Sequence, residues 1–164
     1  MTYSTLASIV KYPFPSILAG KKPKFGFFTT EIEDYIKIAE ELGIKRLSQE
    51  GEPIKYARHP LVFLVEAADD ICYQMMDIED AYKLKLLTPR ETKELYQLFL
   101  DEKKKERVEE VFRLVTDENE QIAYLRATII GLSVKECTQV FMDNEEAILD
   151  GTFEGALIKH ISNP

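Results

Sequence analysis

The sequence predicts an all-α fold with two long helices and several short ones. Apolar residues recur at steps of three and four over two long stretches, 60–87 and 118–149, which is the spacing of one helix face. Proline, glycine and capping residues separate these stretches from their neighbours. No strand-like alternation, internal repeat or low-complexity tract occurs in the 164 residues. We therefore expect a single multi-helical unit.

The N-terminal third is predicted to hold a short helix, a long loop and a second helix. Residues 2–11 can form the short helix, which two prolines end. The loop that follows runs to about Thr30, and loops of this length inside a domain are functional or disordered. Its three phenylalanines favour an ordered loop. Thr30 then caps a helix over 31–42, and residues 44–58 read as a second connection.

The first long helix is predicted from Pro60 to about Leu87. Its expected apolar stripe consists of Leu61, Leu64, Val65, Ala68, Cys72, Met75 and Met76. Thr88 and Glu91 form a capping box for the next helix, with proline at its first position. The charged run 101–107 is predicted to be a solvated helix face or a break between helices.

The second long helix is predicted over 118–149, with Asp117 as its cap. A last short helix is expected at 157–161. The two cysteines, Cys72 and Cys137, are interpreted as buried small hydrophobes in a reducing compartment, which favours the cytoplasm. No stretch has the roughly 20 apolar residues that a membrane span needs, so no membrane association is predicted.

Charge is distributed unevenly along the chain. The net charge of -8 argues against a mainly electrostatic nucleic-acid binder, so such binding has no support from charge. Residues 1–30 nevertheless contain no acidic residue, and their charges come from Lys11, Lys21, Lys22 and Lys24. A basic arm in an acidic protein indicates an anionic ligand.

The first long helix carries an acidic face. On a helical wheel, one sector of about 80° holds Glu66, Asp69, Tyr73, Asp77 and Asp80, with Asp70 at its margin. No Lys or Arg occurs from Pro60 to Tyr82, and like charges four residues apart destabilise a helix. Water and salt, basic groups from another segment, or a divalent metal could offset this repulsion. The spacing alone does not choose between them, although charge runs are usually solvated.

The sequence of this helix resembles that of a known protein family. The segment 58–73, Arg-His-Pro-Leu-Val-Phe-Leu-Val-Glu-Ala-Ala-Asp-Asp-Ile-Cys-Tyr, resembles the signature block of the bacterial dGTP triphosphohydrolase family, and 77–80 continues it. Similar segments follow the family order at 11–13, 24–31, 124–127, Phe141, 144–145 and 148–153, so the resemblance spans nearly the whole chain. It implies the C-terminal, HD-domain-like part of such an enzyme, with a phosphate-side arm at 1–58, the acidic helix at 59–87 and C-terminal helices at 88–164.

The resemblance also implies roles for individual residues. Asp69 matches one ligand of a Mn²⁺, Mg²⁺ or Fe site that holds the water attacking the α-phosphate of a dNTP, with release of deoxynucleoside and triphosphate. Glu66 and Asp70 are expected to support that ligand. Tyr73 matches the residue packed on the deoxyribose, and Asp77 the acceptor for the 3′-hydroxyl. Residues expected near the triphosphate are Lys11, Tyr12 and Lys24.

Without the resemblance these residues have ordinary interpretations. Tyr73 would be a packing residue of an amphipathic helix, Asp77 a solvated acid, and the lysines surface residues. The sequence also departs from the family, because its only histidines are His59 and His160 and neither precedes an aspartate. His59 is interpreted as a capping or packing residue.

A complete family site needs more histidines than this chain has. We therefore expect a fragment that is inactive alone, whose partners are a dNTP, the missing N-terminal half and further copies in a homo-oligomer. A fragment of this kind should expose apolar surface. The alternative is a non-catalytic helical module for nucleotide binding or oligomerisation.

Overall fold

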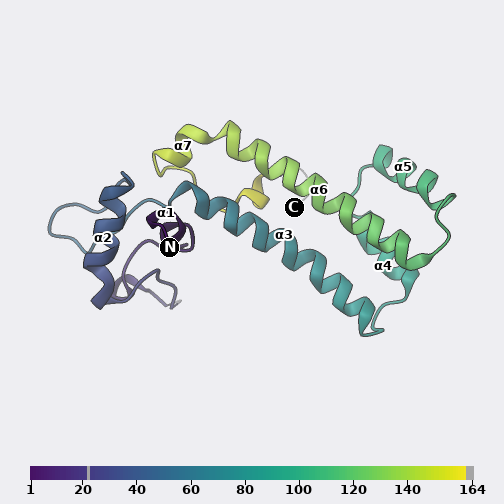
Figure 1. The fold of residues 1–164 in the computed structure, drawn as a ribbon, viewed down its shortest axis with the longest axis horizontal. Helices are drawn as coiled ribbons and strands as arrows, with labels where there is room; N and C mark the ends of the chain where they lie inside the picture. The colour runs from purple at the N-terminus through teal and green to yellow at the C-terminus, as the bar shows by residue number, and fades with distance from the viewer. Residues whose placement is uncertain (22, 162–164) are drawn as a thin grey trace. The chain divides into compact units, whose positions relative to one another are not determined.

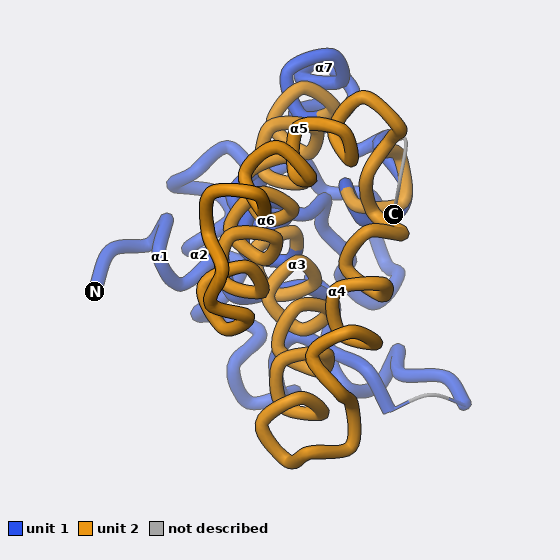
Figure 2. Tube along the Cα trace, turned by 90° about the vertical axis from the view of Figure 1, so that its right-hand side faces the viewer, with its two compact units in different colours: residues 1–66, 141–157 blue, residues 67–140, 158–164 orange. Residues whose placement is uncertain are grey.

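The computed structural model describes residues 1–21 and 23–161, and Lys22 therefore lies outside the described residues. The described chain is all-α, as predicted: it contains isolated β-bridges but no strand (Figure 1). It forms two compact units (Figure 2). Unit 1 comprises residues 1–66 and 141–157, and unit 2 comprises residues 67–140 with the segment from Ile158.

Unit 1 contains α1 (Tyr3–Ser8), α2 (Ile32–Glu41), the start of α3 (Pro60–Lys83) and α7 (Glu145–Leu149). Two 3-10 turns, Ser16–Leu18 and Thr29–Glu31, lie between α1 and α2. Aromatic side chains form the centre of its core.

In that core the ring of Tyr35 stacks on Phe27, with a centroid separation of 4.4 Å, and meets Tyr56 edge-on at 5.8 Å. Ala39 of α2 fills the remaining space and is fully buried. The apolar face of α2 is thereby anchored on the long loop that carries Phe27.

Backbone hydrogen bonds hold together the described residues of the long loop before α2, as its phenylalanines predict. The amide of Ser16 donates to the Phe27 carbonyl over 3.2 Å, and the amide of Gly26 donates to the Phe14 carbonyl over 3.1 Å. Gly26 is required by this approach, since a Cβ there would lie 2.2 Å from the Tyr12 carbonyl oxygen. The pairing brings residues 12–16 beside residues 25–28.

Unit 2 is built from the C-terminal part of α3 with α4 (Pro89–Gln97), α5 (Glu102–Phe112) and most of α6 (Glu118–Asp143). Its core consists of Met75, Tyr96, Leu100, Val108, Ile122, Leu125 and Ile129. Tyr96, with no exposed surface, joins α4 to α3 through its hydroxyl, which donates to the Met75 carbonyl. Side chains from α3, α4, α5 and α6 thus share one core.

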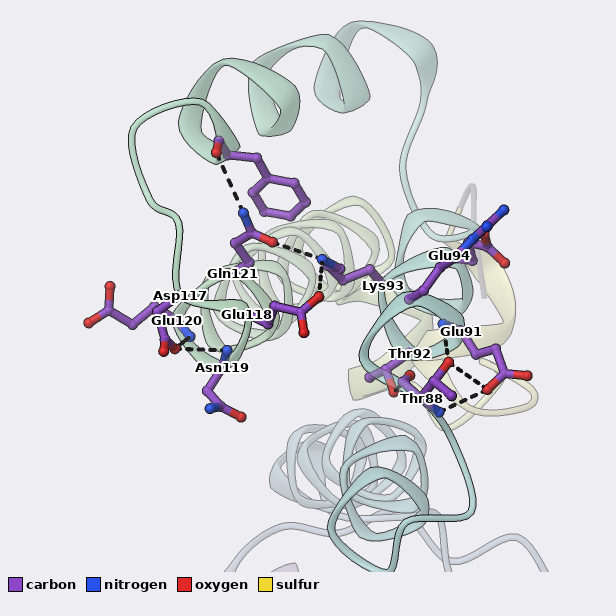
Figure 3. A network of polar contacts seen from close by, with 12 residues as sticks. Thr88, Glu91, Thr92, Lys93, Glu94, Asp117, Glu118, Asn119, Glu120 and Gln121 are labelled. Carbon is purple, nitrogen blue, oxygen red and sulfur yellow. Dashed lines mark hydrogen bonds and ion pairs between the residues drawn. The ribbon is translucent and has the colours of Figure 1, made fainter.

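Polar contacts fix the ends of the helices in unit 2 (Figure 3). The predicted capping box is present, with Thr88 Oγ1 accepting from the amide of Glu91 and the Glu91 carboxylate accepting from the amide of Thr88. Lys93 of α4 binds Glu118 over 3.2 Å and Gln121 over 2.9 Å at the start of α6. Gln121 in turn donates to the Val115 carbonyl, which secures the turn between α5 and α6.

Several predicted boundaries shift. The first long helix ends at Lys83 rather than near Leu87, because Lys85 adopts a left-handed φ of 60°. The charged run 101–107 forms the start of α5. Asp101 caps this helix, because its side chain accepts a hydrogen bond from the amide of Lys104. The second long helix ends at Asp143, and α7 follows it separately.

The predicted apolar stripe of α3 is wrong for most of its members. Only Met75 is buried, and the exposed members are Leu61, Leu64, Val65, Ala68, Cys72 and Met76. The buried row instead consists of Val62, Phe63, Ala67, Ile71 and Met75. Both rows have helical spacing, so the neighbouring elements decide which one is covered.

The interpretation of the cysteines is half right. Cys137 is buried, and this burial raises the pKa of its thiol, whereas Cys72 is exposed because it lies on the uncovered row of α3. Within residues 1–21 and 23–161, no helix combines the length and the apolar character that crossing a bilayer requires.

Candidate functional site

Three of the predicted site residues lie on exposed positions of α3. Asp69, Tyr73 and Asp77 follow one another at four-residue steps and all belong to unit 2. Eight helical residues rise about 12 Å, so these side chains sample one side of the helix over the length of a nucleotide. Tyr73 is 66% exposed and therefore does not act as a core packing residue in the described chain.

Glu66 differs from the other acids of α3. Its side chain is only 8% exposed, and it lies in unit 1, where its two carboxylate oxygens bind different cations. Oε1 lies 2.7 Å from Lys11 Nζ, and Oε2 accepts from Arg58 over 3.0 Å. Basic groups from earlier segments thus offset this carboxylate, one of the three alternatives that the sequence left open. Glu66 shares its sector of the helical wheel with Asp69 and Asp77, but it is buried whereas they are exposed.

Glu79 is also matched by basic groups. It lies 2.8 Å from Lys83 Nζ on its own helix and pairs with Arg126 of α6, within unit 2. The hydrogen bonds from Lys83 and Arg126 hold the pKa of this carboxyl below its usual value. Asp70 is partly buried, and its charge contributes to raising the pKa of the Cys137 thiol. Asp69, Asp77 and Asp80 remain on the exposed side of α3.

The predicted phosphate-side residues belong to unit 1. The ammonium of Lys24 lies 5.5 Å from the centroid of the Tyr12 ring, a cation–π distance, because the loop pairing at Gly26 aligns their two segments. Lys11, directly before Tyr12, is bound to Glu66. Lys21 is exposed. The structure therefore groups Tyr12 with Lys24 and Lys11 with Glu66.

His59 has the capping role that the sequence indicates. Its Nδ1 accepts a hydrogen bond from the amide of Leu61 over 3.2 Å, directly before the first residue of α3. Burial lowers the pKa of its imidazole, which favours the neutral form that this acceptor role requires. His160 is exposed, on a 3-10 turn near the C-terminus.

The described residues do not make a complete divalent-metal site. In the ranges 1–21 and 23–161, no group of three or more His, Cys, Asp or Glu side chains could hold an ion together. Asp69 is a suitable hard ligand on an accessible helix face, but one carboxylate does not satisfy a Mn²⁺, Mg²⁺ or Fe ion. Any such ion would take its other ligands from elsewhere.

Comparison with known proteins identifies the relatives of this chain. A protein from Pseudomonas aeruginosa named deoxyguanosinetriphosphate triphosphohydrolase-like protein is 33% identical over 171 aligned residues, which cover all of this chain. A protein of the same name from Synechocystis is 33% identical over 168 residues, or 97% of the chain. The resemblance seen in the sequence is confirmed. No family model matches the chain.

The match covers a much larger share of this chain than of its relatives. The chain spans 37% of the length of the Pseudomonas aeruginosa relative and 36% of that from Synechocystis. The matched stretch is the C-terminal portion of these relatives. The similarity therefore covers all or nearly all of this chain but only part of each relative.

Arg58 is the residue that sequence reasoning missed. It precedes α3, so the usual search for opposite charges three or four residues apart on one helix does not pair it with Glu66. Its guanidinium forms a salt bridge with Glu66 and also lies 5.5 Å from the centroid of the Phe63 ring. Only the turn of the chain at His59 and Pro60 brings these groups together.

Proposed function

We propose that this chain is the substrate-reading portion of a dNTP triphosphohydrolase, an enzyme that converts dGTP or another dNTP to the deoxynucleoside and triphosphate. The observation that carries the proposal is the exposed series Asp69, Tyr73 and Asp77 on α3, in a chain whose relatives are named for this activity. An exposed tyrosine between two exposed acids suits a sugar that offers both a ring face and hydroxyl groups.

In this proposal each residue of the series has a separate role. The ring of Tyr73 packs against the deoxyribose and disfavours a ribose 2′-hydroxyl, which would lose its hydration against the ring. The Asp77 carboxylate accepts a hydrogen bond from the 3′-hydroxyl. Asp69 supplies one ligand to a divalent ion, and Asp70 supports it.

Lys11, Tyr12 and Lys24 are proposed to contact the triphosphate. Ammonium groups near a tyrosine hydroxyl suit anionic oxygens, and residues 1–30 contain no acid. Because the described residues offer an incomplete metal site, no hydrolytic step is assigned to them, and the 164-residue chain is expected to bind dNTPs without hydrolysing them. We also propose that the protein is cytoplasmic and forms oligomers.

Thermal unfolding with added nucleotides tests the binding role. We expect dGTP or another dNTP with Mn²⁺ to raise the midpoint for the wild-type chain, since a ligand that binds only the folded state stabilises it. The rise should shrink in Y73A and D77A and persist in Q74A, a control at an exposed position of the same helix. Y73A should also lose discrimination between dGTP and GTP. A midpoint that no dNTP changes would contradict the proposal.

The alternative is a non-catalytic nucleotide-binding or oligomerisation module. A chimera that joins the upstream part of the Pseudomonas aeruginosa relative to this chain distinguishes the two. Triphosphate release by the chimera, abolished by D69A, supports the enzyme. A folded chimera that binds dNTPs but releases no triphosphate supports the module.

A further inference from the structure

A cavity of about 410 Å³ lies within unit 1. Its walls come from segments 11–14, 55–58 and 153–155, together with Leu47, Phe63 and Gly151. A backbone hydrogen bond joins the first two walls: the Tyr56 amide donates to the Pro13 carbonyl over 3.0 Å. Its volume is in the range of pockets that hold small ligands, which is roughly 300–1,000 Å³.

Positive charge dominates the lining of this cavity. Lys11, Lys55 and Arg58 line it, whereas Glu154 is the acidic residue among the lining side chains that the structure describes. The opposite balance holds for the whole chain, whose net charge is -8. A basic cavity in an acidic protein favours an anionic ligand.

Glu66 binds two of these cations. Its buried carboxylate binds Lys11 on one oxygen and Arg58 on the other. The guanidinium of Arg58 also lies over the ring of Phe63, which itself meets the Phe153 ring edge-on at 5.5 Å. A guanidinium has five N–H donors, so Arg58 can bind Glu66 and still donate to a second anion.

We propose that this cavity binds the phosphate groups of a triphosphate ligand. Arg58 and Lys55 are binding cations in addition to Lys11, and Glu66 is a positioning residue that holds Lys11 and Arg58 in place. The proposal deepens the proposed function and rests on it for the identity of the ligand. Arg suits this role because its planar fork matches two phosphate oxygens at once.

Binding of inorganic tripolyphosphate to the 164-residue chain, measured by calorimetry at low salt, tests the two cations. We expect R58A to weaken binding about tenfold or more and R58K to fall between R58A and wild type, as the loss of a charged, two-point contact predicts. R90A is the matched control, because Arg90 is exposed on α4 and pairs with Glu94. Wild-type affinity in R58A would overturn the proposal.

The Arg58 variants could fold poorly, so K55A provides a second test of the cavity. Lys55 is exposed, and removing its side chain leaves the core intact. We expect a several-fold weaker tripolyphosphate affinity with an unchanged unfolding midpoint. Equal affinities in K55A and wild type would remove Lys55 from the site.

E66Q separates positioning from simple charge. Removing the carboxylate makes the cavity more positive, so a purely electrostatic account predicts tighter binding of tripolyphosphate. Loss of orientation predicts weaker binding, which is our expected result, with partial recovery in E66D. Tighter binding in E66Q would overturn the positioning role.

The outcomes also separate this inference from the proposed function. If tripolyphosphate binding depends on Arg58 but no dNTP stabilises the chain, the phosphate-binding cavity is supported and the proposed function is rejected. Stabilisation by dNTPs that depends on Tyr73 and Asp77 but not on Arg58 does the reverse.

Discussion

The hydroxyl of Tyr96 on α4 donates a hydrogen bond to the backbone carbonyl of Met75 on α3 over 3.3 Å, at a fully buried position of unit 2. Both residues belong to the core cluster of this unit. The bond therefore joins two helices at the point where their apolar side chains meet.

Replacing Tyr96 by Phe should lower the free energy of unfolding by about 1 kcal/mol, because the ring still fills its space and one buried hydrogen bond is lost. Y96A should cost about 3–5 kcal/mol, since it also leaves a cavity. Urea unfolding followed by circular dichroism measures both. A Y96F protein as stable as wild type would show that the hydrogen bond contributes nothing.

The same change at Tyr35 should have the opposite sign. Tyr35 is buried in unit 1, and its hydroxyl has no hydrogen-bond partner among the described residues. A buried polar group without a partner costs about 1–3 kcal/mol, so Y35F should be neutral or stabilising. Urea unfolding at pH 7 checks this, and a loss of more than about 1 kcal/mol would indicate a partner for the hydroxyl.

Tyr35 also predicts an alkaline loss of stability. Burial raises the pKa of its phenol to about 12, from an ordinary value near 10 in the unfolded chain. The unfolded chain therefore loses this proton first, and the stabilisation present below pH 10 is lost as the pH rises from 10 towards 12. Unfolding midpoints over this range should fall less steeply in Y35F than in wild type, and parallel curves would refute the assignment.

Gly151 and Gly51 separate backbone strain from steric overlap. Both have positive φ, at 72° and 87°, but a Cβ on Gly151 would lie 2.5 Å from the Ala57 Cβ, whereas a Cβ on Gly51 meets nothing within 4 Å. We expect G51A to cost about 1–2 kcal/mol from strain alone, and G151A to cost about 1–3 kcal/mol more from overpacking. Equal losses in chemical denaturation would mean that Ala57 moves aside freely.

His59 predicts a loss of stability on mild acidification. Burial lowers its pKa in the folded chain, so the unfolded chain takes up a proton first as the pH falls. The stabilisation is present above the unfolded pKa of about 6.5 and is lost as the pH falls through that value towards the folded pKa. Unfolding midpoints at pH 7.5 and pH 5.5 measure this loss.

H59N is the matched variant for this pH effect. Asn keeps a side-chain acceptor at the start of α3 but does not titrate, so its midpoint should fall less between the two pH values. His160 is present in both proteins, so the comparison isolates position 59. An equal fall in wild type and H59N would assign the pH dependence to other groups.

The sequence by itself determined most of the helices of this protein and several of their ends. Capping chemistry is local, so the box of Thr88 with Glu91 and the cap at Asp117 follow from the residue types and their spacing. For His59 the sequence left capping and packing open, and the hydrogen bond to the Leu61 amide shows the cap. The relatedness to the triphosphohydrolase-like proteins was also legible, because the segment 58–73 is continuous in sequence.

Only the tertiary structure decided which face of α3 is covered and which acids are bound. Two rows of apolar residues on this helix have the same periodicity, and the row with Val62 and Ile71 is buried because the neighbouring elements contact it. Glu66 and Asp69 are three residues apart and both acidic, yet Glu66 is bound by Lys11 and Arg58 while Asp69 stays exposed. Periodicity fixes positions around one helix, but contacts between distant segments exist only in the folded chain.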